Sequence, residues 1–382
     1  MKSPVKSLLY QNPAVSRAAA DSPASVMKRL SARIRSSYLI PPLMLALLFL
    51  FPHAAGKGAK SGLLLWFEDV LPALLPAMIL SGLCIRLGIV RYLAAGLAPV
   101  GRVLFGLSPY GCYPAFLGFL TGLPAGAAAT AELVVRGDIE KAEGEYLITF
   151  CNNMSPMFLI SYAASDQLGI PGFGLPLCII VWISSILSAR IIRLIRQRTG
   201  THQGTGTGRT PNRTAPDIIA QEISHPSGTL TELADEAIME AFTVLTKVGG
   251  YIVLFSILSA ILSDILGSGM LSCLISGILE TTTGIQNAAS LAESTQLLPN
   301  AESLQALGKG AQWLSVPSNA RLFAVSAVCG FNAFGGLSGL AQTGSVTRKA
   351  GLSLKWYAAS KLLAGLLASA IGAWYCVQFL SK

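Results

Sequence analysis

Long apolar blocks without charged side chains limit what this chain can fold into more than any other feature. Residues 103–131, 175–189 and 322–347 contain no Asp, Glu, Lys or Arg. Charged residues make up 12% of the 382 residues, against about 25% in a typical soluble domain. Blocks of about 18 or more apolar residues can cross the hydrocarbon layer as helices, and we find none of the short alternating segments of a membrane barrel. The sequence therefore predicts an all-α, multi-pass integral membrane protein.

The net charge of +9 comes largely from Lys and Arg residues that flank the apolar blocks, where such residues anchor and orient helices. They do not form the basic patch with interleaved aromatic residues that is typical of nucleic-acid binding. The seven cysteines and three histidines have neither metal-ligand nor redox spacing. No nucleophile set, carboxylate pair with catalytic spacing or phosphate-binding loop occurs. We therefore expect no enzyme, no metal or other cofactor, and no nucleic-acid partner.

Composition divides the chain into two membrane halves. Residues 1–36 are a basic, cytoplasmic N-terminal segment, and residues 37–198 form the first membrane half. Residues 199–235 are a cytoplasmic linker whose first part, 199–216, is rich in Gly, Thr and Pro, a composition typical of flexible linkers. Residues 236–382 form the second membrane half.

Lys and Arg residues near 86–102, 136–141 and 190–213 place those loops on the cytoplasmic side, as positively charged loops usually lie. In the second half the same rule conflicts with the expected hairpin there, because Arg348 and Lys349 would then lie outside.

Two blocks are apolar but interrupted by Gly and Pro. Residues 106–137 contain Pro109, Pro114 and Pro124, and each proline inside a helix costs about 3 kcal/mol. Two half-helices that meet at residues 121–126 fit better than one helix. Residues 322–344 are similarly rich in Gly, and 330–338 resemble 118–126. We therefore predict two inverted-topology repeats, with re-entrant helical hairpins at 106–137 and 322–349. Paired interrupted segments of this kind indicate a transporter binding site.

Polar residues at membrane depth are the candidate ligands. Asn152, Asn153 and Ser155 lie in the middle of an apolar span; they form a substrate site or, alternatively, hydrogen bonds between helices. Glu280, beside Thr281 and Thr282, is an intramembrane carboxylate that couples transport to a proton or a cation, or else an interfacial helix-end residue. Whether residues 265–284 cross the membrane fully is left open.

The expected hairpin tips supply the remaining candidates. Backbone N–H groups at half-helix N-termini favour anions, and glycines allow a ligand to approach the backbone closely, although glycines also mediate plain helix packing. The tip residues predicted to bind substrate are Thr121, Gly122, Pro124, Gly126, Asn332, Gly335, Gly336, Ser338 and Gln342.

Several motifs together carry a family resemblance. They are Gly122-Leu-Pro-Ala-Gly-Ala127, Gly137-Asp-Ile-Glu140, Phe150-Cys-Asn-Asn-Met-Ser-Pro156, Glu280-Thr-Thr-Thr-Gly284 and Gly330-Phe-Asn-Ala-Phe-Gly-Gly-Leu-Ser338. Over residues 37–380 the chain resembles the sporulation integral membrane protein family YlbJ, also called SpoVV, which belongs to the nucleoside-recognition "Gate" domain superfamily. The resemblance implies a fold similar to concentrative nucleoside transporters. Leu123, Ala125 and the longer linker at 199–216 depart from the family pattern.

The resemblance also implies a function. Family members would carry dipicolinic acid during endospore formation, from the mother-cell cytoplasm across the outer forespore membrane. The expected partners are this small aromatic dicarboxylate and membrane lipid; the oligomeric state is open, with a homo-oligomer as one option. Our own hypothesis is that each hairpin tip holds one carboxylate. The alternatives are a nucleoside or nucleobase carrier, and a non-transporting structural protein of spore envelope assembly.

Overall fold

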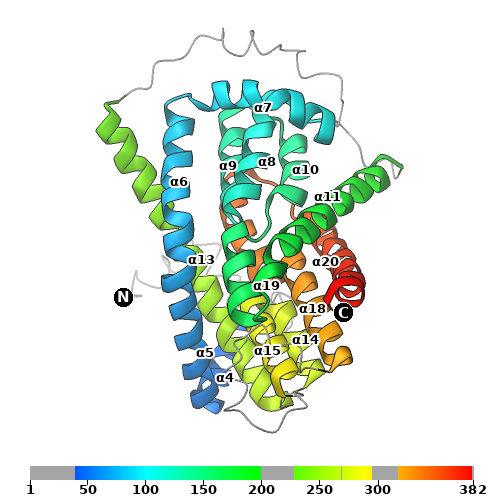
Figure 1. Cartoon of the computed structure of the whole chain (residues 1–382). Helices are drawn as coiled ribbons and strands as arrows, with labels where there is room; N and C mark the ends of the chain where they lie inside the picture. Colours follow the sequence, from blue (N-terminus) through cyan, green and yellow to red (C-terminus); the bar gives the residue numbers. More distant parts are fainter. Residues whose placement is uncertain (1–38, 199–227, 268, 295–316, 381–382) are drawn as a thin grey trace, which may run out of the picture. The chain divides into compact units, whose positions relative to one another are not determined.

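The computed structural model describes residues 39–198, 228–267, 269–294 and 317–380 (Figure 1). The predicted segment 1–36 and most of the linker, 199–227, lie outside these ranges. The described residues fold into helices without any strand, which confirms the all-α class. Four helices are long and apolar enough to cross a membrane, or up to six if each bent pair counts as one span. The multi-pass membrane character is therefore confirmed.

The chain divides into two compact units, and the first ends at Pro52. Its described helix is α4 (Ile40–Leu50), which has proline in its first turn, where the missing N–H is not needed. The second unit runs from His53 to Lys382.

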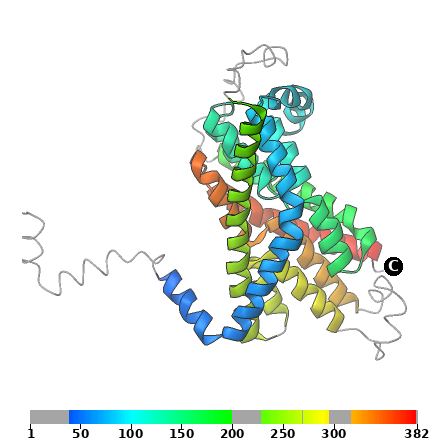
Figure 2. The same ribbon diagram turned by 90° about the vertical axis from the view of Figure 1, so that its left-hand side faces the viewer.

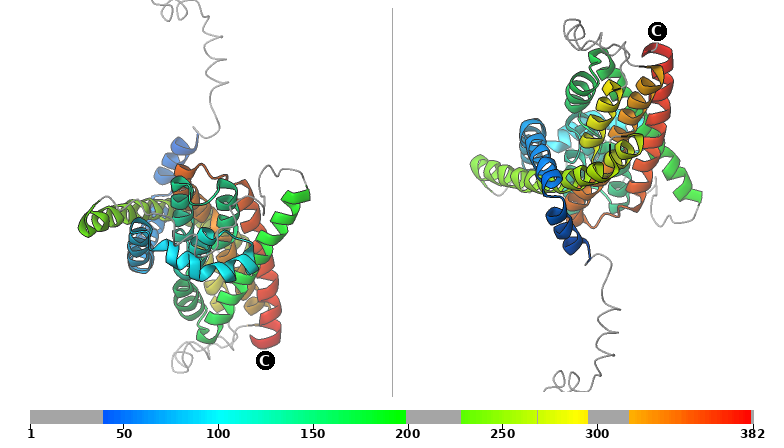
Figure 3. Two further views of the ribbon diagram at one scale, coloured as in Figure 1. Left: turned by 90° about the horizontal axis from the view of Figure 1, so that it is seen from above. Right: turned by 90° about the horizontal axis from the view of Figure 1, so that it is seen from below.

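The second unit begins with a long helical run. α5 (Pro52–Leu65), the π-helical segment η2 (Trp66–Val70) and α6 (Leu71–Arg86) follow one another directly, and α7 (Val90–Phe105) then turns away by 102°. Gly249 of the later helix α13 leaves room for the indole of Trp66, which donates a hydrogen bond to the Leu245 carbonyl (2.9 Å). Figures 2 and 3 show α6 and α13 side by side on one flank.

The first half then forms a hairpin, a broken span and a final helix. α8 (Pro109–Thr121) and α9 (Ala125–Arg136) pack against each other, and the chain turns between them at residues 122–124, within the predicted break. α10 (Lys141–Cys151) ends in an irregular stretch, residues 152–155, beyond which the chain continues as η3 (Phe158–Gln167). The short η4 (Pro171–Phe173) leads into α11 (Gly174–Arg198).

The second half begins with α13 (Leu230–Leu266), whose first turn is closed by a capping box between Thr229 and Glu232. The predicted linker thus includes the first residues of a membrane helix. α14 (Met270–Leu279) and α15 (Thr281–Ser294) pack against each other as a second hairpin. Their closest approach is between Gly277 and Gly284. Residues 265–284 therefore do not cross the membrane as one helix.

The remaining helices correct one prediction. α18 (Ser318–Phe334) and α19 (Gly336–Thr347) do not fold back on each other; with η5 (Arg348–Ala350) they form one candidate span of 33 residues, broken at Gly335. α20 (Lys355–Tyr375) and η6 (Cys376–Leu380) follow. The predicted hairpin at 322–349 is therefore wrong: two adjacent glycines with positive φ, Gly335 and Gly336, interrupt the helix without reversing the chain.

Both halves consequently share one order of elements: hairpin, broken span, final helix. The first-half set is α8–α9, α10–η3 and α11, and the second-half set is α14–α15, α18–α19 and α20. Figure 1 shows the α8–α9 hairpin at one end of the unit and the α14–α15 hairpin at the opposite end. Hairpins that enter from opposite ends are what inverted-topology repeats require.

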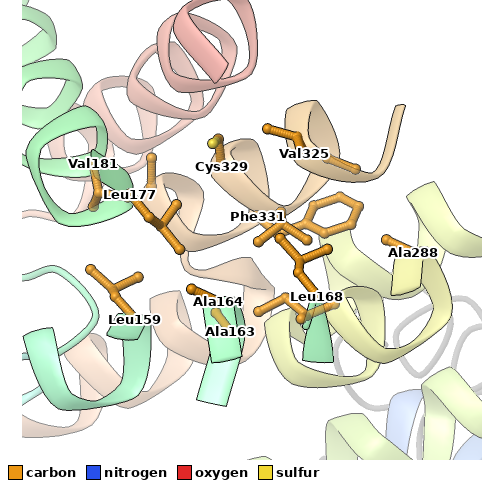
Figure 4. Close-up of a cluster of buried hydrophobic side chains, with 14 of the residues drawn as sticks. Leu159, Ala163, Ala164, Leu168, Leu177, Val181, Ala288, Val325, Cys329 and Phe331 are labelled. Carbon is orange, nitrogen blue, oxygen red and sulfur yellow. The ribbon is translucent and has the colours of Figure 1, made fainter. Parts of the chain in front are cut away.

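Small residues allow close packing within the second half and between the halves. A Cβ on Gly365 of α20 would lie 3.1 Å from the Phe334 Cβ, and one on Gly372 would lie 2.6 Å from the Cys329 Sγ, so α18 and α20 pack closely. Ser188 of α11 meets Ser360 of α20 at 3.0 Å. Figure 4 shows part of the apolar core, with side chains from η3, α11, α15 and α18.

A group of ion pairs marks one end of the unit. Lys349 binds Glu240 (2.7 Å) and Glu132 (3.3 Å), and Arg86 binds Glu240 (2.8 Å) and Glu236 (3.3 Å). Lys349 therefore lies at the same end as Arg86, because α18–α19 runs on as a span. This removes the conflict that the expected second hairpin created for Arg348 and Lys349.

Candidate substrate-binding site

The break in the first half is held by two buried asparagines. Asn152 Nδ2 donates to the Thr343 hydroxyl (2.7 Å) and the Tyr357 hydroxyl (3.0 Å), both in the second half. Asn153 Nδ2 donates to the Phe150 carbonyl (2.7 Å), and its Oδ1 accepts from Ser185 (2.7 Å). The bond to the Phe150 carbonyl replaces one that the interrupted helix gives up, and the other bonds join the break to α11, α19 and α20.

The first hairpin tip sits on this break. The Leu123 N–H donates to the Asn153 carbonyl (2.6 Å). Gly122 has φ +86°, and a Cβ there would lie 2.5 Å from the Ser155 nitrogen. Only glycine permits this contact without strain or displacement. The tip and the break of the first half are therefore one packed assembly.

The second half repeats the arrangement. A Cβ on Gly336 would lie 3.2 Å from the Leu279 carbonyl, and the Thr281 hydroxyl donates to the Phe331 carbonyl (3.4 Å). The tip of the α14–α15 hairpin thus rests on the break of α18–α19.

Glu280 forms the turn of this second tip and is 4% exposed. Its Oε2 accepts from the Thr283 N–H (2.9 Å) and from the Thr282 and Thr283 hydroxyls. The carboxylate thereby caps the N-terminus of α15, where negative charge is favourable. A substrate carboxylate cannot use the same donor, so our hypothesis of one carboxylate per tip does not fit the second tip.

All four chain interruptions meet at one cavity of about 320 Å³. Leu123 comes from the first tip, Met154 and Ser155 from the first break, Glu280 and Thr282 from the second tip, and Gly335 from the second break. Gln342 of α19 adds an amide. Ligand pockets usually measure about 300–1,000 Å³, so this cavity suits a small molecule.

The rest of the lining comes from η2, η3 and their neighbours. It includes the aromatic rings of Phe158 and Tyr162, which stack with centroids 4.7 Å apart. Four carboxylic acids line the cavity, namely Glu68, Asp69, Asp166 and Glu280, and no Lys or Arg is among its described lining residues. Within the described ranges no three His, Cys, Asp or Glu side chains are grouped as a metal site.

The predicted site residues divide into two groups. Those in the lining are Ser155, Glu280, Thr282, Gly335 and Gln342. The others lie behind the lining and hold the hairpin tips and the broken spans in place: Thr121, Gly122, Pro124, Gly126, Asn152, Asn153, Thr281, Asn332, Gly336 and Ser338.

Sequence reasoning missed the acidic and aromatic part of the lining. Glu68 and Asp69 lie inside an apolar block, and intramembrane carboxylates are functional candidates by default, so that signal was available. No comparable signal marks Leu123, Phe158 or Tyr162, because apolar and aromatic residues are common throughout such spans.

Two similar halves, each a hairpin packed on a broken span, enclose a central cavity and define this chain as a polytopic α-helical membrane protein with an internal repeat. It is similar to the sporulation integral membrane protein YlbJ of Bacillus subtilis (strain 168), at 29% identity over 256 residues. The match covers 63% of this chain and 61% of that protein, less than two thirds of either. It confirms the resemblance to the YlbJ family. No protein-family model and no solved structure matches the chain.

Proposed function

We propose that this protein is a membrane carrier for a small planar molecule, not an enzyme. The observation that supports this is the meeting of two hairpin tips and two broken spans at one cavity. Irregular backbone at membrane depth is tolerated only where it is buried in protein or lines a cavity, and in carriers such breaks form the substrate site. A purely structural protein has no need of four interruptions around an open space.

The first candidate substrate is dipicolinate, which the YlbJ resemblance implies. On this proposal the protein acts in sporulation and carries dipicolinate from the mother-cell cytoplasm across the outer forespore membrane. The four carboxylic acids in the lining would repel a bare dianion. We therefore propose that dipicolinate enters together with protons or a cation, which offset this repulsion.

The second candidate is a nucleoside or nucleobase, consistent with the predicted Gate-domain relationship. The specific observation in its favour is the lining itself, which combines hydroxyls, an amide and carboxylic acids without any described Lys or Arg. Such groups hydrogen-bond neutral rings without requiring a counter-charge.

Uptake into proteoliposomes tests both candidates. Purified full-length protein is reconstituted, and entry of labelled dipicolinate and labelled uridine is compared, with and without a proton or sodium gradient. Saturable dipicolinate uptake that unlabelled dipicolinate competes away is the expected result. Uridine uptake alone would favour the second candidate, and uptake of neither compound would refute the carrier proposal.

A matched pair of variants ties uptake to the cavity. Leu123→Trp would place a large ring in the cavity, whereas Leu120→Trp lies one turn earlier on α8, where the side chain is 69% exposed. We expect Leu123→Trp to abolish uptake and Leu120→Trp to retain it, with both proteins present at equal amounts in the vesicles.

A further inference from the structure

A lysine without an acidic partner lies inside the protein, away from the cavity lining. Lys361 of α20 is fully buried (0% exposed), and its Nζ donates to Asn153 Oδ1 at 2.8 Å. Among the described residues no carboxylate oxygen lies within 4.0 Å of this nitrogen. Burying an ammonium ion against neutral groups is costly, and ionisable residues at such depth mark proton or ion pathways.

The surroundings of Lys361 explain how the ammonium is held. α10 ends at Cys151, so the carbonyls of its last turn lack helical partners and carry partial negative charge. α20 supplies two donors here: Ser360 binds the Thr149 carbonyl (3.3 Å), and Lys361 binds Asn153. The ammonium ion is thus stabilised by the C-terminal end of α10 and by the amide oxygen of Asn153, and both belong to the break of the first half.

Two hydrogen bonds link Lys361 to the cavity. Its Nζ binds the Asn153 side chain, and the Asn153 carbonyl accepts from the N–H of Leu123. Leu123 is the residue through which the first hairpin tip lines the cavity. A rearrangement of the tip or the break therefore alters the environment of the ammonium directly.

We propose that Lys361 is the proton-binding site that couples substrate movement to the proton gradient. The inference rests on the proposed carrier function and names its coupling residue. With the tip seated on the break, Lys361 carries a proton and binds Asn153. In the state that opens to the other side of the membrane, the hairpin tip and the break separate. One N–H bond of the ammonium then breaks, the proton passes to water, and a neutral amine remains. The amine takes up a new proton from water on the first side when the cycle returns.

Other ionisable groups on the helices packed against Lys361 are directed elsewhere. Arg190 and Arg193 of α11 bind the Leu104 and Phe105 carbonyls, Arg196 pairs with Glu145, and Glu143 of α10 accepts from the Ser108 N–H. Arg321 of α18 binds the Leu380 carbonyl. The thiols are Cys151, Cys178, Cys329 and Cys376, and Tyr357 lies one turn before Lys361.

The test uses proteoliposomes with the membrane potential clamped and a pH-sensitive dye in the lumen. If one proton moves with each dipicolinate molecule, a gradient of one pH unit supports about tenfold accumulation on the alkaline side. Wild-type protein should show this accumulation and should acidify the lumen when dipicolinate is added outside. Lys361→Gln keeps a donor for Asn153 but cannot carry the proton. It should exchange dipicolinate between the two sides yet show no gradient-driven accumulation.

Two further variants separate proton transfer from a fixed charge. Lys361→Arg keeps a permanent charge and should also lose gradient-driven accumulation, whereas Lys355→Gln, on the exposed start of the same helix, should behave like wild type. Full accumulation by Lys361→Gln or Lys361→Arg would overturn the inference, and so would net dipicolinate uptake by the wild-type protein without any change in lumen pH. The wild-type measurement can therefore overturn the inference even if a variant fails to reach the membrane. Absence of wild-type exchange would instead refute the carrier function itself.

Discussion

Glu280 illustrates how one side chain combines a structural and a functional position. Its carboxylate caps α15 through Thr283, and the same residue lines the cavity. A cap of this kind contributes about 0.5–2 kcal/mol. The residue therefore fixes the second tip and gives the cavity one of its acids.

Substitutions at Glu280 should separate these two contributions. Glu280→Gln keeps an oxygen that accepts from the Thr283 N–H, so we expect little change in thermal stability in detergent but a clear loss of uptake. Glu280→Ala removes the cap and should lower the unfolding free energy by about 0.5–2 kcal/mol. Glu232→Gln, in the exposed capping box of α13, serves as the control. Normal uptake by Glu280→Gln would show that the carboxylate takes no part in transport.

Gly122 can be compared with Gly137, because both have a positive φ. Their φ angles are +86° and +80°, and their ψ angles are −170° and 11°. A Cβ on Gly122 would meet Ser155, whereas a Cβ on Gly137 would meet nothing within 4 Å. Alanine at Gly137 carries a left-handed strain of about 1–2 kcal/mol. At Gly122 the strain is about 1–3 kcal/mol, because that combination of φ and ψ is essentially confined to glycine. We expect only Gly122→Ala to abolish uptake, since only there is the tip displaced. Equal transport by the two alanine variants would mean that the seating of the tip on the break is not required.

At the scale of elements, the contact between α13 and η2 depends on one glycine of an adjacent pair. Gly249 faces the Trp66 ring, and a Cβ there would lie 2.7 Å from it, while Gly250 faces open space. Both lie inside the continuous helix α13, so the helix propensity gained on substitution by alanine is the same at both positions.

Gly249→Ala should therefore destabilise the protein and Gly250→Ala should not. Overpacking typically costs about 1–3 kcal/mol, whereas alanine in a helix interior gains about 0.5–1 kcal/mol over glycine. Thermal unfolding in detergent, read from tryptophan fluorescence, measures the difference. A Gly249→Ala protein that unfolds no earlier than Gly250→Ala would contradict the packing described for α13.

The elements also show which signals in the sequence were sufficient. Prolines and glycines in 106–137 marked the first hairpin correctly, because the chain turns at Gly122 and Pro124, although α8 accommodates Pro114 in its interior. In 330–338 similar glycines serve a different purpose: Gly330 lets α20 approach closely, and Gly335 and Gly336 interrupt the helix. The resemblance to 118–126 was therefore compositional. Asn332 lies in the last turn of α18, just before the break that corresponds to the one at Asn152 and Asn153.

The second hairpin, α14–α15, escaped prediction because its break contains neither Gly nor Pro. The chain turns at Glu280, and the only sign is a carboxylate followed by three threonines. That pattern is typical of a helix start, and it was interpreted as the end of a span. The cavity could not be predicted at all, since it depends on how tips and breaks from distant segments pack together.

At the scale of the whole molecule, the end of the second unit that carries the ion pairs of Lys349 and Arg86 should face one compartment, and the opposite end should face the other. Lys349 lies beside Arg86, whereas Gly172 lies in the exposed turn between η3 and α11 at the other end of those spans. Because basic residues gather on the cytoplasmic side, we expect Lys349 inside and Gly172 outside.

Cysteine labelling in intact cells checks this topology. In a Cys84→Ser background, which removes the only described cysteine that is not buried, Gly172→Cys should react with a membrane-impermeant maleimide. Lys349→Cys should react only after the cells are permeabilised. The reverse pattern would invert the proposed orientation of both halves.

The ion pairs at that end have a mechanical consequence. Lys349 joins α19 to Glu132 on an arm of the first hairpin and to Glu240 on α13, and all three side chains are 20–45% accessible. Pairs exposed to this degree contribute only about 0–1 kcal/mol each and weaken further as salt rises. On the proposed carrier function, ion pairs of this strength hold α9, α13 and η5 together between turnovers, and thermal motion is enough to separate them. The speed of such a carrier would then depend on how readily its buried interior reorganises.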